Sequence, residues 1–582
     1  MRVIILGISE THCATAAILR DGAIIGCASE ERFTRLKNDA GYPRLAVEAL
    51  LAECGLTARD VDLVALAGRQ AYAREWMNRV LHDVAYAQEY YGVRLAPPAR
   101  GLGRRVRKLG ARVGLSDRAR GKAELSDAER FALVTEHLGI ARERIVTFDH
   151  HTCHAAAAYF GSHFGGAPAL VLTNDNSGDG LCASASSALG SVLTRREATP
   201  SAPGSLGAFY SFVTLLLGMK FGEHEYKVMG LAPYAPAGAA DRAEAALRAV
   251  FDLEPGTPAR FAWKRRGPRY RLLLEATLGQ RFDAIAAGAQ RIVEDALLRW
   301  VRLMRERYGG DRLALGGGVF MNVKANGRIA EEEWLRDLFV FPSCGDESNA
   351  VGAAYLAYVA RGGTAPKAFG PAYLGPSITP EAVEALIRKR DLSARYRVTE
   401  HEHIEERIAE LLVADGVVAR CAGRMEFGAR ALGNRSILGN PSDHRVVTLI
   451  NKMIKNRDFW MPFAPSVLRE READYIVNRR GVASPYMMLA FPTNPKRRDE
   501  IVAAVHPHDG TARAHLVDQA WNPEYHRVIR EFERRTGIGA VLNTSFNLHG
   551  EPLVASPEDA VDTFERSGLP HLALDRWLIS KR

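Results

Sequence analysis

The feature that most constrains the fold is a strand–turn–strand pattern that occurs twice in the chain. Residues 2–8 form an apolar, partly β-branched run, and two more strand-like runs follow it, joined by Asp21-Gly22. An Asp-Gly pair between two such runs is typical of a β-hairpin. The pattern recurs at residues 168–189, around the turn sequence NSGDG. Alanine-rich, helix-forming segments come after each copy, at 44–56 and 285–308. We therefore predict an α/β protein that begins with a duplicated unit.

A segment rich in proline and glycine, residues 364–376, ends the first pattern. Such segments favour loops, so we place a domain boundary there and expect domains at 1–368 and 369–582. The length of 582 residues agrees with two domains, because one hydrophobic core rarely organises a chain of this size. Hydrophobic residues make up 47% and charged residues 25%, values typical of globular proteins and not of disordered or fibrous chains.

The expected location of the protein is the cytoplasm. The first residues contain a single arginine and lack a small-residue cleavage site, so they predict a strand and not a signal peptide. No stretch reaches the roughly 18 apolar residues that a membrane span needs, so no membrane association is expected. The seven cysteines are scattered and form no CxxC pair, which favours a reducing compartment.

Much of the net charge of +9 comes from a basic segment between Arg94 and Lys122. We interpret that segment as a solvated insertion. A nucleic-acid-binding role is the alternative, but no aromatic side chains interleave with the charges after Tyr91, and no RNA-binding module is visible. Nucleic acid is therefore not an expected partner.

The sequence DHHTCHAAAAYF places His150 and His154 four residues apart in a helix-forming context. Both imidazoles then project from one face and can bind one metal ion, although a packing or surface role is the alternative for such a pair. Asp175 follows a strand-like run and Asp346 precedes a small-residue helix. These carboxylates favour a metal site, because ligands gather at strand ends in α/β folds. Two imidazoles with two carboxylates suit iron, zinc or manganese better than calcium or magnesium.

A glycine turn follows the strand-like run LAL, and its backbone amides can approach phosphate oxygens. The alternative is a purely structural turn, since the motif is neither a Walker motif nor GxGxxG. The candidates are Gly316, Gly317 and Gly318, with Asn322 and Asn326 for ribose or base contacts.

The C-terminal part contains arginines and lysines set between glycines and apolar strands. Guanidinium groups bind phosphate in bidentate fashion, and glycines let the backbone approach a polyphosphate. A solvated charge run is the alternative. The pattern predicts an anion pocket for a nucleotide, with the candidates Arg424, Arg430, Arg435, Lys452, Lys455, Arg457, Arg513, Asn543, Ser545 and Asn547.

Taken together, these motifs resemble the NodU and aminoglycoside or cephalosporin O-carbamoyltransferase family over essentially the whole chain. The matching segments are the N-terminal hairpin with His12, HHTCHAAAAYF, EYKVMGLAPY, GGGVFMN, GDESNAVGAA, GRMEFGARALGNRS, PFAPSVL and LNTSFNLHGEPLV. The resemblance implies a duplicated actin-like (ASKHA, TsaD-like) domain at 1–368, which binds metal and nucleotide, and a YrdC-like α/β domain at 369–582.

The resemblance also implies an ATP-dependent O-carbamoyltransferase of natural-product or antibiotic biosynthesis. ATP with Mg²⁺ and carbamoyl phosphate would give carbamoyl adenylate in the C-terminal pocket. The carbamoyl group would then pass to a hydroxyl of a small acceptor in the N-terminal domain. There Fe²⁺ on the histidine and aspartate cluster is the expected Lewis acid, and His12, titrating near neutrality, is the expected base. Lys37 would steady the AMP leaving group or the adenylate.

Four positions depart from the pattern of this family. Cys13 follows His12 where an acid is usual, and Asn176 replaces a common glycine. Met461 stands where an arginine is frequent, and His515 where a glutamine is frequent. The orientation of His12 and one phosphate contact must therefore be set in another way.

Two other functions compete with small-molecule carbamoylation. One is carbamoyl or threonylcarbamoyl transfer onto tRNA or a protein. The other is a non-catalytic, nucleotide-regulated protein of actin-like fold, against which the histidine and aspartate set argues. The sequence leaves the acceptor and a homodimer open.

Overall fold

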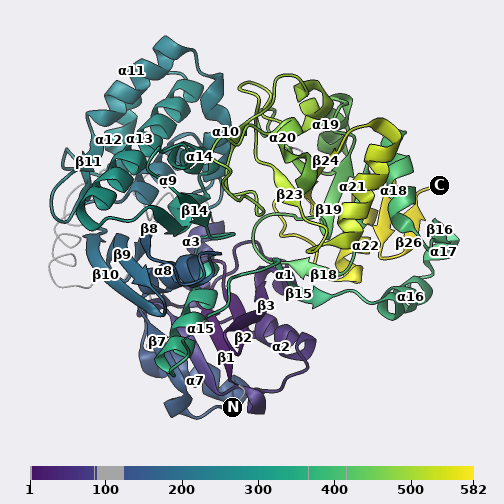
Figure 1. Ribbon diagram of the computed structural model, residues 1–582, viewed down its shortest axis with the longest axis horizontal. Coiled ribbons are helices and arrows are strands. Elements are labelled where there is room, and N and C mark those ends of the chain that lie inside the picture. The colour runs from purple at the N-terminus through teal and green to yellow at the C-terminus, as the bar shows by residue number, and fades with distance from the viewer. Residues whose placement is uncertain (1–2, 84–85, 88–123, 365, 415, 456) are drawn as a thin grey trace, which may run out of the picture.

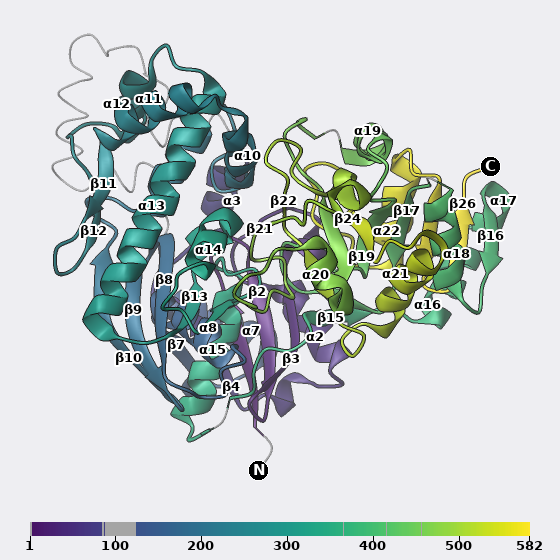
Figure 2. The ribbon, with the colours of Figure 1, turned by 45° about the horizontal axis from the view of Figure 1, so that its top comes forward.

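The computed structural model describes residues 3–83, 86–87, 124–364, 366–414, 416–455 and 457–582. The predicted basic insertion lies outside these residues. The N-terminal part, coloured purple to teal, and the C-terminal part, coloured green to yellow, form two lobes that meet along one side of each (Figures 1 and 2). Within the described residues, no helix is long and apolar enough to cross a membrane.

The N-terminal lobe contains two five-stranded sheets of the same construction. The first has the order β3 (Ala23–Ser29), β2 (Thr15–Arg20), β1 (Ile4–Ser9), β4 (Leu63–Ala67) and β7 (Ile145–Phe148). The second has the order β10 (Val192–Pro200), β9 (Leu181–Leu189), β8 (Ala169–Gly178), β13 (Arg312–Gly316) and β14 (Asp337–Val340). In both, the first three strands are antiparallel and the last two pairings are parallel. The predicted duplication is therefore confirmed.

The Asp-Gly hairpin is confirmed in its geometry as well. Asp21 and Gly22 connect β2 and β3 with φ values of 50° and 81°. Two successive positive φ values define the turn that suits the twist of a tight hairpin, and Asp and Gly tolerate them best.

Two alanine-rich helices lie between the sheets. Helix α8 (His150–Phe160) packs on the second sheet, and α15 (Ser348–Ala360) packs on the first, so each helix covers the sheet of the other half. The helices approach so closely that a Cβ on Gly352 would lie 1.9 Å from the carbonyl oxygen of Cys153. Small residues make this contact, which explains the alanine content of both segments.

Further helices cover the outer faces of these sheets. Helices α2 (Arg44–Glu53) and α7 (Asp127–Leu138) pack on the first sheet, while α9 (Leu206–Leu216) and the long α13 (Phe282–Tyr308) pack on the second. The predicted helices at 44–56 and 285–308 correspond to α2 and α13. A core on each face explains why the central strands are apolar throughout.

The C-terminal lobe is built on one mixed sheet of eight strands. Its order is β16 (Arg397–Glu400), β26 (Trp577–Ser580), β25 (His571–Leu574), β17 (Val418–Cys421), β19 (Arg435–Gly439), β24 (Ala540–Ser545), β20 (Ala464–Leu468) and β23 (His515–Val517). Successive residues of β17 face different cores: Val418 packs under α18 (Ile404–Val413) and α21 (Pro523–Thr536), and Ala419 under α22 (Pro557–Arg566). Both lobes are thus α/β, as predicted.

The lobes are joined by a short strand and by arginine contacts. Strand β15 (Tyr373–Ser377) pairs with β18 (Arg424–Glu426). Arg32 Nη2 donates to the carbonyl of Gly428 across the junction. The expected boundary between residues 368 and 369 falls in the connection from α15 to β15 and stays a prediction.

Candidate functional site

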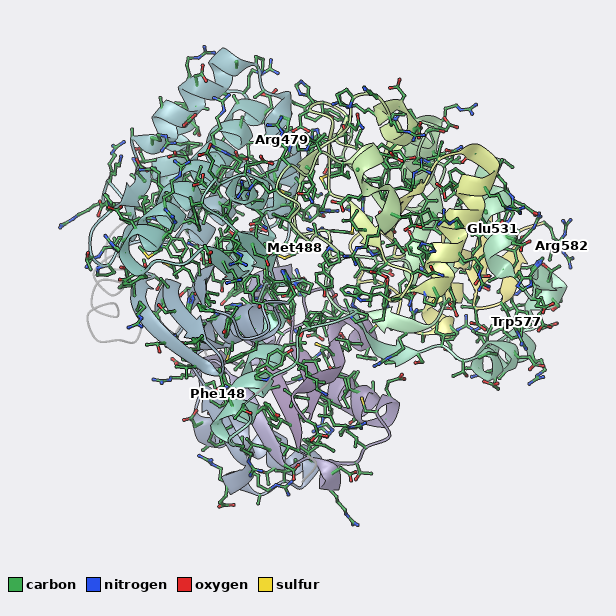
Figure 3. The ribbon with its side chains drawn as sticks, viewed as in Figure 1. Phe148, Arg479, Met488, Glu531, Trp577 and Arg582 are labelled. Atoms are coloured by element: carbon green, nitrogen blue, oxygen red, sulfur yellow. The ribbon has the colours of Figure 1, made fainter. Side chains whose placement is uncertain are left out.

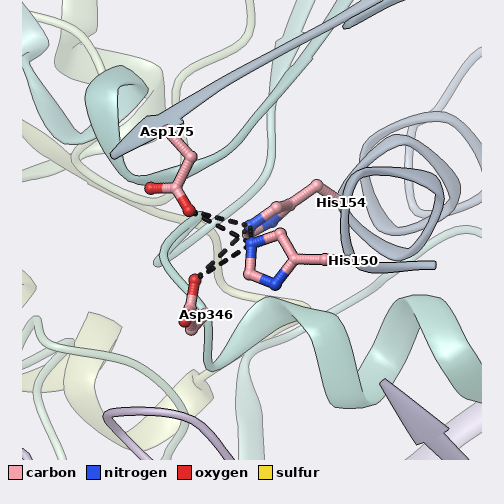
Figure 4. Close-up of side chains that lie close together, drawn as sticks. All are labelled: His150, His154, Asp175 and Asp346. Carbon is pink, nitrogen blue, oxygen red and sulfur yellow. Dashed lines mark hydrogen bonds and ion pairs between the residues drawn. The ribbon is translucent and has the colours of Figure 1, made fainter. Parts of the chain in front are cut away.

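Four side chains from three segments meet at the centre of the N-terminal lobe (Figure 4). His150 and His154 project from one face of α8, Asp175 lies near the end of β8, and Asp346 lies just before α15. Their ligand atoms all lie within 4.8 Å of one another, and all four residues are buried. His150 Nε2 is 3.1 Å from Asp175 Oδ2 and 3.5 Å from Asp346 Oδ1. The predicted metal-ligand set is thus brought together.

Hydrogen bonds orient the two imidazoles. The hydroxyl of Ser348 donates to the carbonyl of Gly345 at 2.7 Å, so at 3.1 Å from His154 Nδ1 it can only accept. This arrangement places the proton of His154 on Nδ1 and turns the lone pair of Nε2 toward the cluster. Asp179 fixes the start of α8, because its carboxylate accepts from the backbone N–H of His150 at 2.8 Å and from those of Arg69 and Gln70. Sequence reasoning missed Asp179, although the turn NSGDG contains it.

The cluster fits a bound divalent cation. Asp346 Oδ1 is buried and has no hydrogen-bond partner within the described residues, and buried carboxylate oxygens are rarely left so. Burial raises the pKa of Asp346, but His150 and His12 outweigh that effect and hold it below its ordinary value. Two imidazole nitrogens and two carboxylate oxygens suit a transition metal. His151 lies off this face, as expected, and shares a hydrogen bond with Thr173 at 2.8 Å.

His12 lies beside this cluster in the turn after β1. Its Nδ1 is 3.2 Å from Asp346 Oδ2, and its side chain is 36% exposed toward the cavity. Burial lowers the pKa of His12, but Asp346, together with Asp175 and Glu347, outweighs that effect and raises the pKa to about 9, above the near-neutral value expected. Cys13 does not orient His12: its thiol donates to Asn38 Oδ1 at 3.3 Å. Asp346 orients the imidazole instead, and Nε2 has no hydrogen-bond partner within the described ranges of the chain.

Lys37 faces the same cavity as His12. Its Nζ is 3.1 Å from Glu223 Oε1, and Lys220 Nζ is 3.2 Å from the other oxygen of that carboxylate. Glu223 thereby holds Lys37 beside the cavity. Burial lowers the pKa of Lys37, but Glu223, Tyr226 and Glu31 together outweigh that effect and raise the pKa above its ordinary value.

A single cavity of about 720 Å³ connects this region with the C-terminal lobe. His12, Lys37, Asp175 and Asp346 line it from one side, and β24 and the loop at Arg430 line it from the other. The two predicted sites therefore lie in one continuous cavity, whereas the sequence indicated two separate pockets.

Four cations face the C-terminal end of the cavity: Arg430, Lys455, Arg457 and Arg513. Among the described residues, none of them forms an ion pair with a carboxylate. Burial, followed by Arg457, lowers the pKa of Arg430 to about 10 and lowers that of Lys455 as well. The Nε atoms of Arg430 and Arg513 are buried, and no hydrogen-bond partner for them is found in the part of the chain that the structure describes. Such mutual repulsion is costly unless an anion binds, so this cluster is a candidate anion site.

Polar groups complete the cation cluster. Lys455 Nζ donates to Ser545 Oγ and to the carbonyl of Asn547, both at 3.1 Å. The amide of Asn543 donates to Ser466 Oγ at 3.0 Å, and its Oδ1 has no partner among the described residues. His515 stands behind it, 3.1 Å from Ser466 Oγ, so this departure from the family pattern supports Asn543 through Ser466.

Three of the predicted binding residues have structural roles instead. Arg435 is buried and donates to the carbonyls of Ala422 and Ala555. Arg424 donates to the carbonyls of Leu374 and Ile25, at the junction of the lobes. Asn326 donates to the carbonyls of Phe320 and Met488, the latter at the boundary of the lobes in Figure 3. None of the three lines the cavity, and each already donates to backbone carbonyls, so their contact with a nucleotide stays a prediction.

The glycine turn is only partly exposed to the cavity. Gly316 and Gly317 let β13 pack against α8 and β8, since a Cβ on Gly317 would lie 2.4 Å from the carbonyl oxygen of Asn174. Gly318 does line the cavity, and its N–H donates to Asp175 Oδ1 at 3.2 Å. Asn322 lines the cavity too, with its amide bonded to Gln290. The glycine turn therefore holds Asp175 of the histidine and aspartate cluster in place, and only its Gly318 faces the cavity, where a phosphate could bind.

The fold and the site define a two-lobed α/β protein with a candidate metal centre and a candidate anion site in one cavity. The family description "Carbamoyltransferase N-terminus" matches residues 4–355, and "Carbamoyltransferase C-terminus" matches residues 409–581. The chain therefore belongs to the carbamoyltransferase family, whose members are enzymes, and the resemblance inferred from its motifs is confirmed.

Related proteins span nearly the whole chain. An uncharacterised protein of Synechocystis sp. is 33% identical over 99% of this chain and 96% of its own length. Nodulation protein NolNO of Sinorhizobium fredii is 31% identical over 98% of this chain and 79% of its own length. Nodulation protein U of Rhizobium fredii is 26% identical over 99% of this chain and 95% of its own length.

Solved structures are similar only in part. HypF in its phosphate- and nucleotide-bound form is 11% identical, with a TM-score of 0.36 over 62% of this chain and 46% of that one. Component A of the (R)-2-hydroxyglutaryl-CoA dehydratase of Acidaminococcus fermentans is 15% identical, with a TM-score of 0.33 over 62% and 99%. Both matches are distant and cover only part of this chain.

Proposed function

We propose that this protein is an ATP-dependent O-carbamoyltransferase that modifies a hydroxyl of a small molecule. The observation that carries the proposal is the cavity, which has unpaired cations at one end and the His12, histidine and aspartate group at the other. A nucleotide can bind at the first end while a carbonyl group is attacked at the second. The repeated sheet topology supports an actin-like fold for the N-terminal lobe, and we assign a YrdC-like role to the C-terminal lobe.

The first reaction takes place among the cations. Water releases phosphate from carbamoyl phosphate and leaves carbamate. A carbamate oxygen then bonds to the α-phosphorus of ATP as the bond to pyrophosphate breaks, giving carbamoyl adenylate. The four cations of the cluster neutralise charge that would otherwise repel the carbamate. Asn543 Oδ1 is placed to accept a hydrogen bond from the NH₂ group of the carbamate. ATP would enter with Mg²⁺.

The second reaction takes place beside His12. The acceptor oxygen bonds to the carbonyl carbon, the bond from that carbon to the adenylate oxygen breaks, and the hydroxyl proton passes to His12 Nε2. AMP departs next to Lys37. A divalent cation on His150, His154, Asp175 and Asp346, with iron as our assignment, would polarise a substrate oxygen and take up the Asp346 charge that raises the pKa of His12.

The two reactions can be separated by mutation. We expect the wild-type protein to release pyrophosphate from ATP only when carbamoyl phosphate is present. His12→Ala should lower carbamoyl transfer by roughly 10²–10⁴-fold, the usual contribution of a general base, while pyrophosphate release continues. Arg430→Ala should stop both reactions.

A matched control is His163→Ala, which removes an exposed histidine that is bonded to Asp337 and does not line the cavity. This variant should retain both reactions. Pyrophosphate release that is absent from the wild type, or that disappears in His12→Ala, would contradict the proposal.

A further inference from the structure

Helix α3 (Arg74–His82) presents an apolar face to the cavity. Its side chains Trp76, Met77, Val80 and Leu81 all line the cavity, on the same side as His12 and Lys37. The polar side chains of the helix do not line the cavity, and Glu75 and Arg79 among them are exposed. Apolar side chains beside a catalytic group form a surface against which a substrate can pack.

This apolar face is held at a fixed distance from His12. Arg74 and Asn78 both donate to Asp39 Oδ1, at 3.1 and 2.8 Å. The Asp39 carboxylate is buried, and its backbone carbonyl accepts from the N–H of Ala14, two residues after His12, at 2.8 Å. The helix and the His12 turn therefore form one hydrogen-bonded unit, which is how an acceptor hydroxyl would be aimed at His12 Nε2.

The carboxylates near this face are already engaged. Glu223 pairs with Lys37 and Lys220, and Glu31 accepts from the N–H of Asn38 at 2.8 Å. Glu225 accepts from Ser211 and from the N–H of Gly222. The four side chains that α3 turns to the cavity carry no charge themselves, so an ammonium group packed against them would lack a counter-charge there, which is costly in a cavity.

We infer that α3 forms the acceptor-binding wall, and that the acceptor is a neutral alcohol whose hydroxyl-bearing ring presents an apolar face. A polycationic amino sugar does not match this wall. The inference rests on the proposed carbamoyltransferase function, but binding to the wall needs neither ATP nor carbamoyl phosphate, so the two can be tested apart.

The binding test uses tryptophan fluorescence of the full chain. Phenyl β-D-glucopyranoside serves as the neutral, ring-bearing probe and kanamycin as the polycationic probe. We expect a saturable change with the glucoside at lower concentration than with kanamycin. Trp76→Phe should remove most of this change while leaving the melting temperature within a few degrees. No saturable change with the glucoside, tighter binding of kanamycin, or an undiminished signal in Trp76→Phe would overturn the inference.

The kinetic test uses Met77→Ala and, as its matched control on the opposite side of the helix, Glu75→Ala. Met77→Ala should raise the KM for the glucoside roughly fivefold to tenfold, which corresponds to ~1–1.4 kcal/mol of apolar contact, and should change kcat less. Glu75→Ala should leave KM unchanged. Equal effects of the two variants on KM would contradict the inference that α3 binds the acceptor. Absence of pyrophosphate release in the wild type would instead remove the proposed function and leave the fluorescence result standing.

Discussion

At the scale of single residues, two arginines of one motif have opposite roles: one is fully hydrogen-bonded within the fold, and the other lacks acceptors within the described part of the chain. Arg430 and Arg435 are five positions apart in GRMEFGARALGNRS. Arg435 is surrounded by carbonyl oxygens that accept its N–H groups, whereas Arg430 faces other cations and has a buried Nε without a partner. A buried charge with a full set of acceptors stabilises the fold, and one without them is retained for a ligand.

This contrast predicts opposite stability effects of one substitution. Arg430→Met should raise the free energy of unfolding of the ligand-free protein by ~1–2 kcal/mol, because it removes an unpaired charge and keeps the volume. The same variant should lose the stabilisation that pyrophosphate gives to the wild type. Arg435→Met should lower the free energy of unfolding by about 3 kcal/mol or more. Denaturant unfolding with and without pyrophosphate measures both, and destabilisation by Arg430→Met would argue against an anion site there.

The sequence predicts which residue types gather but not which of them are used within the fold. His150 and His154 were predictable because four residues along a helix place two side chains on one face. Arg424 and Arg435 donate hydrogen bonds to the carbonyls of Ile25 and Ala555, among others, and these residues lie far away in the chain. No local pattern reports such contacts, so the sequence could not indicate that these two arginines lie apart from the cavity.

At the scale of elements, the pair α8 and α15 determines the geometry of the metal-type cluster. Helix α8 carries both histidines, and Asp346 immediately precedes α15. Their contact depends on Gly352, whose Cα lies against the carbonyl of Cys153. The repeated strand pattern made the sheets predictable. The exchange of helices between the two sheets was not, because it is a long-range arrangement without a local signal.

The close contact predicts the effect of one added methyl group. Gly352→Ala should destabilise the protein by about 2–4 kcal/mol, since backbone must move to accommodate the Cβ. It should also lower the metal content of purified protein, because the histidines and Asp346 shift apart. Gly238→Ala, at an exposed position of helix α11 (Ala237–Arg248), is the control and should change stability by less than ~1 kcal/mol. Thermal unfolding and elemental analysis report the two effects, and equal behaviour of the variants would refute this account of the packing.

At the scale of the whole molecule, the two lobes together line a cavity that neither forms alone. Arg35 of the N-terminal lobe donates to the carbonyls of Pro552 and Leu553, and both of those residues line the cavity. Residues more than 500 positions apart thus meet at its wall, which explains why the sequence indicated separate pockets. Carbamoyl adenylate that stays within this cavity would be shielded from bulk water, where it would hydrolyse.

Arg35→Ala should therefore uncouple ATP consumption from carbamoyl transfer in the proposed enzyme without stopping either reaction. The variant loses both contacts to the 552–553 segment, so we expect the adenylate to escape and the ratio of pyrophosphate released to carbamoylated product to rise severalfold. Arg407→Ala, which removes a surface arginine paired with Glu410, should leave that ratio as in the wild type. Both products are measured in one reaction, so a change in total activity cancels. An unchanged ratio in Arg35→Ala would mean that the contact between the lobes does not retain the intermediate, and that transfer is fast compared with its escape.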